Sequence, residues 1–211
     1  MTYTVWQPST LLLVGVGGQG LLTCAQILGD AAQRAGFPVR VGQLHGMSQR
    51  GGSVECTVLL SAGYDNHISL GEADVVLAFE PLEGLRAVPR MHPQTRVLLN
   101  MDPVPPFELV RTKRPYPDCA DIQNTISAHC HVVFPLSAQE LAKESGFLRS
   151  QNLLLLGAAF GLGLLPFGQS VLEEAFLARF SAAFATQNHD AFLLGIRVGN
   201  NLLDRSDKGQ A

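Results

Sequence analysis

Four glycines within one short segment are the first feature of this chain that could do chemistry. The segment LLLVGVGGQG places them at positions 15, 17, 18 and 20, between an apolar run and a second apolar stretch. Gly15, Gly17 and Gly20 fit G-x-G-x-x-G, the fingerprint of a nucleotide-binding strand–turn–helix. We predict that Gly15 permits a tight turn, that Gly17 lets backbone approach an anion and that Gly20 lets the helix pack on the sheet. The helix N-terminus would then present free N–H groups to a phosphate or carboxylate.

The same glycines are also compatible with a purely structural role, in which they serve only close packing of the strand and the helix. A standard NAD site needs, in addition, an acidic residue at the end of the second strand, about 20 residues further on. The second strand is predicted at residues 38–43 and ends without Asp or Glu, while Asp30 lies within the predicted helix. Ordinary NAD binding is therefore disfavoured.

A second polar segment, residues 44–53, reads LHGMSQRGGS and follows the second predicted strand. In a doubly wound sheet it lies at the carboxyl edge, where ligands bind, beside the first glycine loop. Arg50 is a permanent cation that could hold a carboxylate or phosphate with two hydrogen bonds, and His45 titrates near neutral pH. These two are the candidate catalytic residues; the alternative is a surface loop with a solvated arginine. The residues predicted to bind a cofactor or co-substrate are Gly15, Gly17, Gly18, Gln19, Gly20, Ser48, Gln49, Arg50, Gly51 and Gly52.

Other reactive side chains form no recognisable site. Ser48 has no evident His and Asp partners, so nucleophilic catalysis is not predicted. The four cysteines form no C-x-x-C pair, and no Cys/His cluster has zinc or iron–sulfur spacing, so no metal site is predicted. Cys24 and Cys56 lie in apolar periodic contexts and are predicted to be core thiols.

Three polar residues stand at the ends of predicted elements on the same edge. Glu80 follows the apolar strand at residues 73–79, and packing at a helix start explains it better than ligand contact. Asn100 ends the next strand and Asn152 heads an apolar helix. Neither asparagine is assigned a role.

The amino-acid composition and net charge limit the classes of partner and the location to be expected. The chain has 211 residues, of which 46% are hydrophobic and 16% charged, and this charged share is below the roughly 25% of a typical soluble domain. Either the core is large or a partner covers part of the surface. The net charge of −3 gives no indication of nucleic acid or an anionic membrane as a partner. The N-terminus lacks a signal-peptide pattern and no apolar run is long enough to span a bilayer, so a cytoplasmic location is expected.

The elements that must position these residues alternate between strands and helices and then become helical only. Residues 102–117 contain five prolines and are predicted as an extended loop with one short strand at residues 107–110. This order predicts an α/β fold: a Rossmann-like, mostly parallel sheet flanked by helices, with a helical C-terminal part. Residues 1–211 are expected to form one domain, with residues 1–9 as a loose leader. Strands are predicted at residues 10–16, 38–43, 53–60, 73–79, 96–99 and 131–135, and helices at 18–35, 81–88, 119–129, from Ser137, and at 152–165, 170–184 and 189–203.

Three segments, in order, carry a resemblance to a known family. GVGGQG, then HGMSQRGGSV, then GEADVVLAFEPLEGLR resemble the gamma-type component of the 2-oxoacid:ferredoxin oxidoreductases. The resemblance extends over residues 10–200 and includes Tyr116, Pro117 and Asn152. The HGMSQ lead-in before Arg-Gly-Gly is closest to the indolepyruvate branch of that family.

This resemblance implies oxidative decarboxylation of an arylpyruvate, with coenzyme A as acyl acceptor and ferredoxin as electron acceptor. It also implies a large partner subunit that carries thiamine diphosphate and iron–sulfur clusters. The present chain is expected to hold no cofactor alone, to be inactive alone and to complete the partner's site. The alternatives are a stand-alone nucleotide- or flavin-binding Rossmann-like protein and a structural subunit whose loop binds nothing. Whether the glycine loop contacts coenzyme A, another anion or partner backbone stays open.

Overall fold

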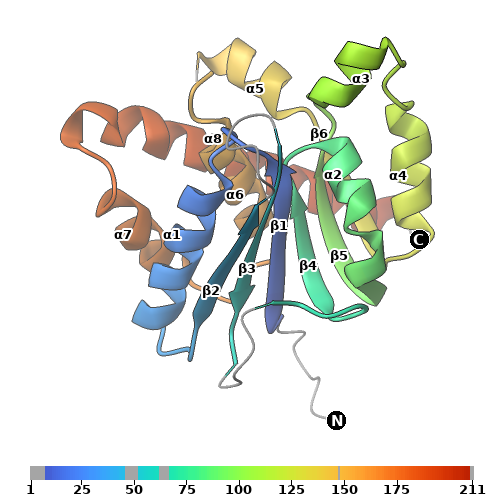
Figure 1. Cartoon of the computed structure of the whole chain (residues 1–211). Coiled ribbons are helices and arrows are strands. Elements are labelled where there is room, and N and C mark those ends of the chain that lie inside the picture. Colours follow the sequence, from blue (N-terminus) through green and yellow to red (C-terminus); the bar gives the residue numbers. More distant parts are fainter. Residues whose placement is uncertain (1–7, 46–51, 62–66, 147, 210–211) are drawn as a thin grey trace.

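The computed structural model describes residues 8–209 except 46–51, 62–66 and 147. Six strands form one sheet in the order β2-β3-β1-β4-β5-β6 (Figure 1). Strands β1, β4, β5 and β6 run parallel, whereas β3 is antiparallel to both of its neighbours. The expected mostly parallel α/β sheet is confirmed, with this one antiparallel strand inserted. The strands are β1 (Thr10–Val16), β2 (Arg40–His45), β3 (Ser53–Leu59), β4 (Ala73–Ala78), β5 (Met91–Asn100) and β6 (Val132–Leu136).

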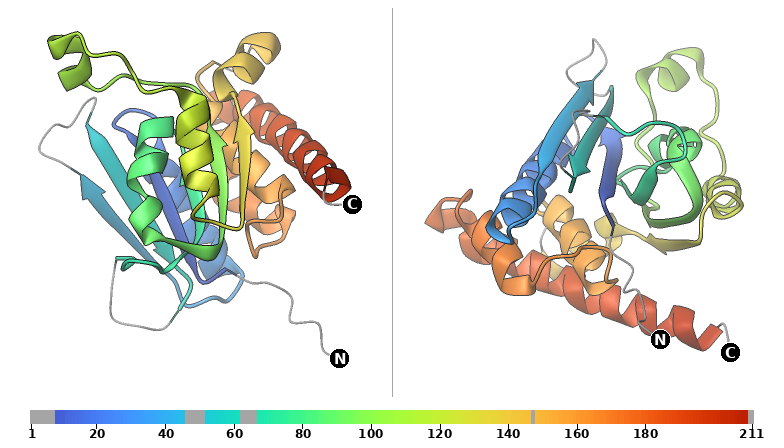
Figure 2. Two further views of the ribbon diagram at one scale, coloured as in Figure 1. Left: turned by 90° about the vertical axis from the view of Figure 1, so that its right-hand side faces the viewer. Right: turned by 90° about the horizontal axis from the view of Figure 1, so that it is seen from below.

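Helices cover both faces of the sheet, as Figures 1 and 2 show. On one face lie α1 (Leu21–Arg34) and α6 (Gln151–Gly161), with α7 (Gln169–Leu177) and α8 (Ala182–Gly209) packed outside them. On the other face lie α2 (Pro81–Arg86) and α4 (Cys119–Ser127), while η1 (Val88–Arg90) leads into β5. The short helices α3 (Phe107–Thr112) and α5 (Ala138–Ser145) stand at the carboxyl edge. Because both faces are covered, β1 and β4 are apolar along nearly their whole length.

Several predicted bounds differ from the structure: β5 begins five residues earlier than predicted, α7 ends at Leu177, and three further differences have a local physical reason. The first helix begins at Leu21 rather than residue 18, because Gly18 and Gly20 have φ of +106° and +81° and belong to a turn. The predicted strand at residues 107–110 is wrong, since these residues begin α3. Pro106 precedes that helix, and proline is favoured at helix starts because its φ is fixed. The last helix begins at Ala182, directly after a serine whose carbonyl accepts the first helical hydrogen bonds.

Helices α6 and α8 meet through glycines spaced four residues apart, which places each pair on one helix face. A Cβ added at Gly157 would lie 2.1 Å from the carbonyl oxygen of Phe192, and one added at Gly195 would lie 2.1 Å from that of Leu154. The two backbones are therefore in direct contact, an arrangement that only residues without a side chain allow. No helix in the described part of the chain has the length and apolar character that crossing a membrane requires.

Asp74, the second acidic residue of the GEAD segment, joins the starts of β4 and β1. One carboxylate oxygen of Asp74 accepts from the N–H and hydroxyl of Ser9 at 2.7 and 2.9 Å and from those of Thr10, both at 3.0 Å. Burial by itself would raise the pKa of Asp74, but these hydrogen bonds outweigh it and hold the pKa below its usual value of 3.8. Asp74 therefore has a structural role.

We expect Asp74→Asn to lower the free energy of unfolding at neutral pH by roughly 1.5–3 kcal/mol, because charge-assisted hydrogen bonds are lost. The folded-state pKa of Asp74 lies below its unfolded value, so the contribution is complete above the unfolded pKa and is lost as pH falls through the folded pKa. Urea denaturation of both proteins between pH 7 and pH 3 measures this effect. A difference in stability that stays constant over that range would contradict the assignment.

Candidate functional site

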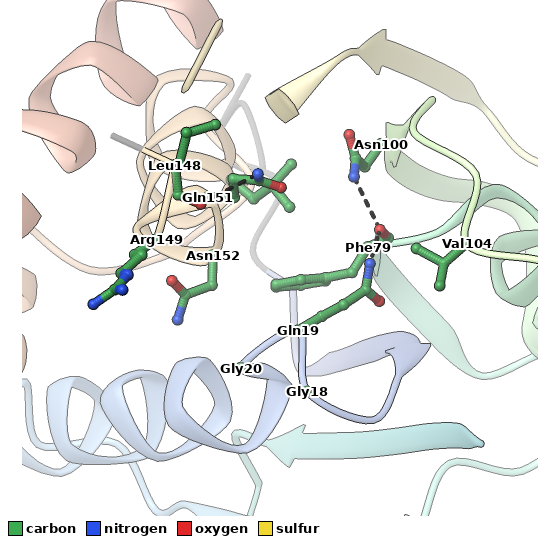
Figure 3. Close-up of a pocket in the computed structure, with 11 residues that line it drawn as sticks. Gly18, Gln19, Gly20, Phe79, Asn100, Val104, Leu148, Arg149, Gln151 and Asn152 are labelled. Atoms are coloured by element: carbon green, nitrogen blue, oxygen red, sulfur yellow. Dashed lines mark hydrogen bonds between the residues drawn. The ribbon is translucent and has the colours of Figure 1, made fainter. Parts of the chain in front are cut away.

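A cavity of about 480 Å³ opens at the carboxyl edge of the sheet (Figure 3). It lies where the connection after β1 passes over one face of the sheet and the connection after β4 passes over the other. Such a switch point is where open α/β sheets bind ligands. The cavity is lined by Gly18, Gln19, Gly20, Phe79, Asn100, Val104, Leu148, Arg149, Gln151, Asn152 and Leu155.

Two side-chain amides brace the floor of this cavity. Gln19 donates from Nε2 to the carbonyl oxygen of Phe79 at 2.9 Å, and its Oε1 accepts from the N–H of Val16 at 2.7 Å. Asn100 donates to the same Phe79 oxygen at 2.9 Å and accepts from the N–H of Ala138 at 3.0 Å. Both amides are thus engaged within the protein, as the dashed lines in Figure 3 show for Phe79. They hold the glycine loop, two strand ends and the start of α5 in fixed positions.

Gly15 has a different role from the one expected, and the N–H of Gly17 is engaged within the protein. Gly15 lies within β1, so the expected turn at this position is wrong; the turn begins at Gly17. A Cβ at Gly15 would stand 2.6 Å from Oε1 of Gln19 and 2.9 Å from Cβ of Phe79, so close packing explains this glycine. The N–H of Gly17 donates to the carbonyl oxygen of Gly52 at 2.8 Å. Because this N–H already has a hydrogen-bond partner within the protein, it is not available to a ligand in this structure.

Gly20 brings two helix starts together. It is the N-cap of α1 with φ of +81°, a left-handed conformation that glycine adopts without strain. A Cβ at this position would lie 2.6 Å from Nδ2 of Asn152, in the first turn of α6. We expected Gly20 to allow packing on the sheet; its close neighbour is α6 instead. Asn152, which the sequence left without a role, therefore forms one wall of the cavity.

The second loop ends beside the first, as expected. The Gly52–Gly17 hydrogen bond places its last residues against the glycine turn. The hydroxyl of Ser53 then donates to the buried carboxylate of Glu83 at 2.6 Å, and Arg86 contacts the other oxygen of that carboxylate at 2.5 Å. His45 is the last residue of β2, whereas Ser48, Gln49, Arg50 and Gly51 lie outside the described residues.

The start of α6 supplies a cation that sequence reasoning missed. Helices α1 and α6 both begin at the cavity, and neither has an acidic residue in its first turn or a side-chain cap. Each N-terminus therefore directs partial positive charge toward this space. Arg149 is the single ionisable side chain among the described residues that line it, and it lies at the exposed rim. The sequence does contain a signal for this cation: Arg149 stands just before a leucine-rich helix whose first turn has no acidic residue.

The buried carboxylate of Glu80 fixes the segment that contains Val104, a residue that lines the cavity. Glu80 is fully buried and caps α2 by accepting from the N–H of Glu83 at 2.9 Å, which confirms its role at a helix start. It also accepts from the N–H of Val104 at 3.2 Å and from the hydroxyl of Tyr116. The hydroxyl oxygen of Tyr116 in turn accepts from the N–H of Leu82 at 2.9 Å. Burial, and then the contact with Glu80, raise the pKa of Tyr116, so this hydroxyl stays protonated.

The two cysteines predicted as core thiols are both buried. Burial raises the pKa of Cys24 to about 12 and that of Cys56 to about 11, so both are neutral thiols at physiological pH. Among the described residues, no group of three or more His, Cys, Asp or Glu side chains could hold a metal ion. The prediction of core thiols is confirmed.

A family model described as pyruvate ferredoxin/flavodoxin oxidoreductase matches residues 10–198. The chain belongs to this family. The match includes the glycine loop, the cavity residues and α6, and it ends within α8. The resemblance inferred from three short segments is thereby confirmed over nearly the whole chain.

Curated relatives of this chain are named for one branch of the family, the indolepyruvate oxidoreductases. The indolepyruvate oxidoreductase subunit IorB of Methanothermobacter thermautotrophicus is 41% identical over 149 residues, which cover 71% of this chain and 76% of that protein. The subunit of the same name from Thermococcus kodakarensis is 34% identical over 195 residues, which cover 92% of this chain and 96% of that protein. Both relatives are thus matched over most of their length.

Solved structures of related enzymes share the fold. The gamma subunit of a keto/oxoacid ferredoxin oxidoreductase from Geobacter sulfurreducens has a TM-score of 0.65 at 20% identity, covering 91% of this chain and 98% of that one. The 2-oxoglutarate:ferredoxin oxidoreductase of Magnetococcus marinus, solved with 2-oxoglutarate, coenzyme A and succinyl-CoA bound, has a TM-score of 0.68 at 19% identity. It matches 93% of this chain but 32% of that longer chain.

The family's glycine loop differs here from a dinucleotide site. In a Rossmann fold the acidic residue that binds ribose follows the second strand. Here β3 stands between β1 and β2, so the end of β2 is one strand further away, and β2 ends in His45. Together with the engaged N–H of Gly17, this geometry supports the inference that ordinary NAD binding is disfavoured.

Proposed function

We propose that this chain is the small, beta-type subunit of an indolepyruvate:ferredoxin oxidoreductase. The relatives of that name at 41% and 34% identity support the substrate class. The reaction is the oxidative decarboxylation of an arylpyruvate with coenzyme A. The carboxylate leaves as carbon dioxide, the acyl carbon forms a thioester with the thiol, and the released electrons pass to ferredoxin.

The large subunit is the proposed carrier of thiamine diphosphate and the iron–sulfur clusters. The described residues of the present chain offer no metal-binding group, and its cysteines are not clustered in sequence. The longer Magnetococcus marinus chain, of which this fold is about a third, supports an enzyme with further parts. This chain then completes a site whose redox groups belong to its partner.

The cavity is the observation that supports this role most directly. Two helix N-termini and Arg149 surround it, so it suits an anionic group such as the carboxylate of the oxoacid or a phosphate of coenzyme A. Val104, Leu148 and Leu155 line the same space and would contact apolar parts of the substrate. The Gln19–Asn100 brace would keep these groups in place while the substrate binds. Arg50, which lies outside the described residues, stays a proposed second anion-binding side chain.

Isolation of the subunits tests the proposal. We expect the purified chain alone to show no turnover with indolepyruvate, coenzyme A and ferredoxin, and the complex with its large subunit to be active. Turnover by the isolated chain at the rate of the complex, or failure to bind any large thiamine-dependent subunit, would contradict it. A yellow chromophore bound to the isolated chain would instead support a flavin-binding protein.

A further inference from the structure

Residues 101–117 leave the sheet after β5 and carry α3 outward before the chain returns to α4; we call this segment the arm. In both figures α3 stands clear of the sheet, beyond its carboxyl edge (Figures 1 and 2). The arm contains five prolines. A projecting segment of this kind needs an explanation, because it adds little to the core.

The base of the arm is fixed at two points by one buried side chain. Glu80 accepts from the N–H of Val104, near the start of the arm, and from the hydroxyl of Tyr116, near its end. Glu80 is fully buried, so neither hydrogen bond competes with solvent at the carboxylate. The prolines restrict the chain further by fixing φ. The arm is therefore preorganised, and a preorganised segment loses less conformational entropy when it binds a partner.

The tip of the arm is apolar and cationic. Val110 in α3 is 62% exposed, among the most exposed large apolar side chains in the described chain. Arg111, Lys113 and Arg114 follow within four residues and are all exposed, although the chain as a whole has a net charge of −3. Glu108 lies on the same short helix, so the excess positive charge at the tip comes from Lys113 and Arg114. Such a local charge attracts a surface of the opposite sign and speeds its approach.

We propose that the arm docks on an acidic surface of the large subunit, with Val110 buried there and Lys113 and Arg114 facing carboxylates. This inference rests on the proposed function. Val104 belongs to the arm and also lines the cavity, so a partner that completes the cavity must lie beside the arm. Leu148, which is 55% exposed, lines the same cavity as Val104.

A double charge reversal tests the arm. The variant Lys113→Glu/Arg114→Glu is compared with Arg197→Glu/Arg205→Glu, which makes the same change in net charge on the exposed side of α8. Binding to the immobilised large subunit is measured at low and high salt, after circular dichroism has shown that each variant is folded. We expect the arm variant to associate about tenfold more slowly at low salt and to lose most of its salt dependence. The α8 variant should associate like the wild type.

The possible outcomes separate this inference from the proposed function. If the wild-type chain binds no large subunit, the proposed function fails. If the wild type binds and both variants bind equally well, or are weakened equally, the docking of the arm is overturned. Normal assembly of the arm variant with a raised KM for ferredoxin would also overturn it, since ferredoxin would then be the partner of the arm.

Discussion

Gly195→Ala is expected to lower the free energy of unfolding by about 3 kcal/mol or more, since overpacking a tight contact carries such costs. A single methyl group at this position would lie 2.1 Å from the carbonyl oxygen of Leu154 and 2.8 Å from the N of Ala158. Backbone atoms of a packed helix cannot rotate away as a side chain can, so α6 and α8 would have to separate. Without that contact, alanine would stabilise a helix interior by up to about 1 kcal/mol.

Gly168→Ala is the matched control for this prediction. Gly168 is the N-cap of α7, has φ of −71° and has no atom within 4 Å of an added Cβ, so the Gly168→Ala protein should lose no more than about 1 kcal/mol of unfolding free energy, through the weaker cap alone. Urea denaturation of the three proteins measures the differences from their midpoints at unchanged slope. A Gly195→Ala protein as stable as the wild type would show that the two helices are not in backbone contact.

Arg149→Ala is expected to raise the KM of the assembled enzyme for its anionic substrate or for coenzyme A about ten- to a hundredfold. The loss of one charge-assisted contact is worth roughly 1.5–3 kcal/mol, and each 1.4 kcal/mol is a factor of ten. Arg149→Lys should restore part of the affinity, because it keeps the charge but not the planar guanidinium. Steady-state kinetics with each substrate varied in turn shows which anion is affected.

Arg205→Ala serves as the control, because Arg205 is exposed on α8 away from the cavity. Gel filtration with the large subunit shows whether assembly is intact in each variant. Normal assembly with an unchanged KM for both substrates would show that Arg149 does not contact either substrate. Loss of assembly would place Arg149 in the subunit interface rather than in contact with a ligand.

Local signals in the sequence predicted much of the fold. The apolar run before Gly15 gave β1, and Pro81 marked the start of α2. Ser137, where a helix was predicted to begin, caps α5 by accepting from the N–H of Glu140 at 3.1 Å, and Ser followed three residues later by Glu is a helix-start pattern. These signals act over a few residues, so one chain is enough to read them.

Pairing between distant segments was not predictable in the same way. The alternation in β3 indicates which side chains face the core, but it does not say whether the strand runs parallel or antiparallel to β1. The brace between Gln19 and Phe79 joins residues 60 positions apart. Gly20 and Asn152 meet only once α6 has packed beside α1, so Arg149 could not be placed at the glycine loop from spacing alone.

The glycine contact between α6 and α8 also bears on synthesis of the chain at the ribosome. Domains generally fold as units during synthesis. The sheet is complete in sequence at Leu136, but α6 gains its backbone partner only after Gly195 and Gly199 have been made. Arg149 and Asn152 stand at the start of α6, and the core on that face of the sheet includes residues of α6, α7 and α8, so the cavity takes its final form only when the last part of the chain has been made.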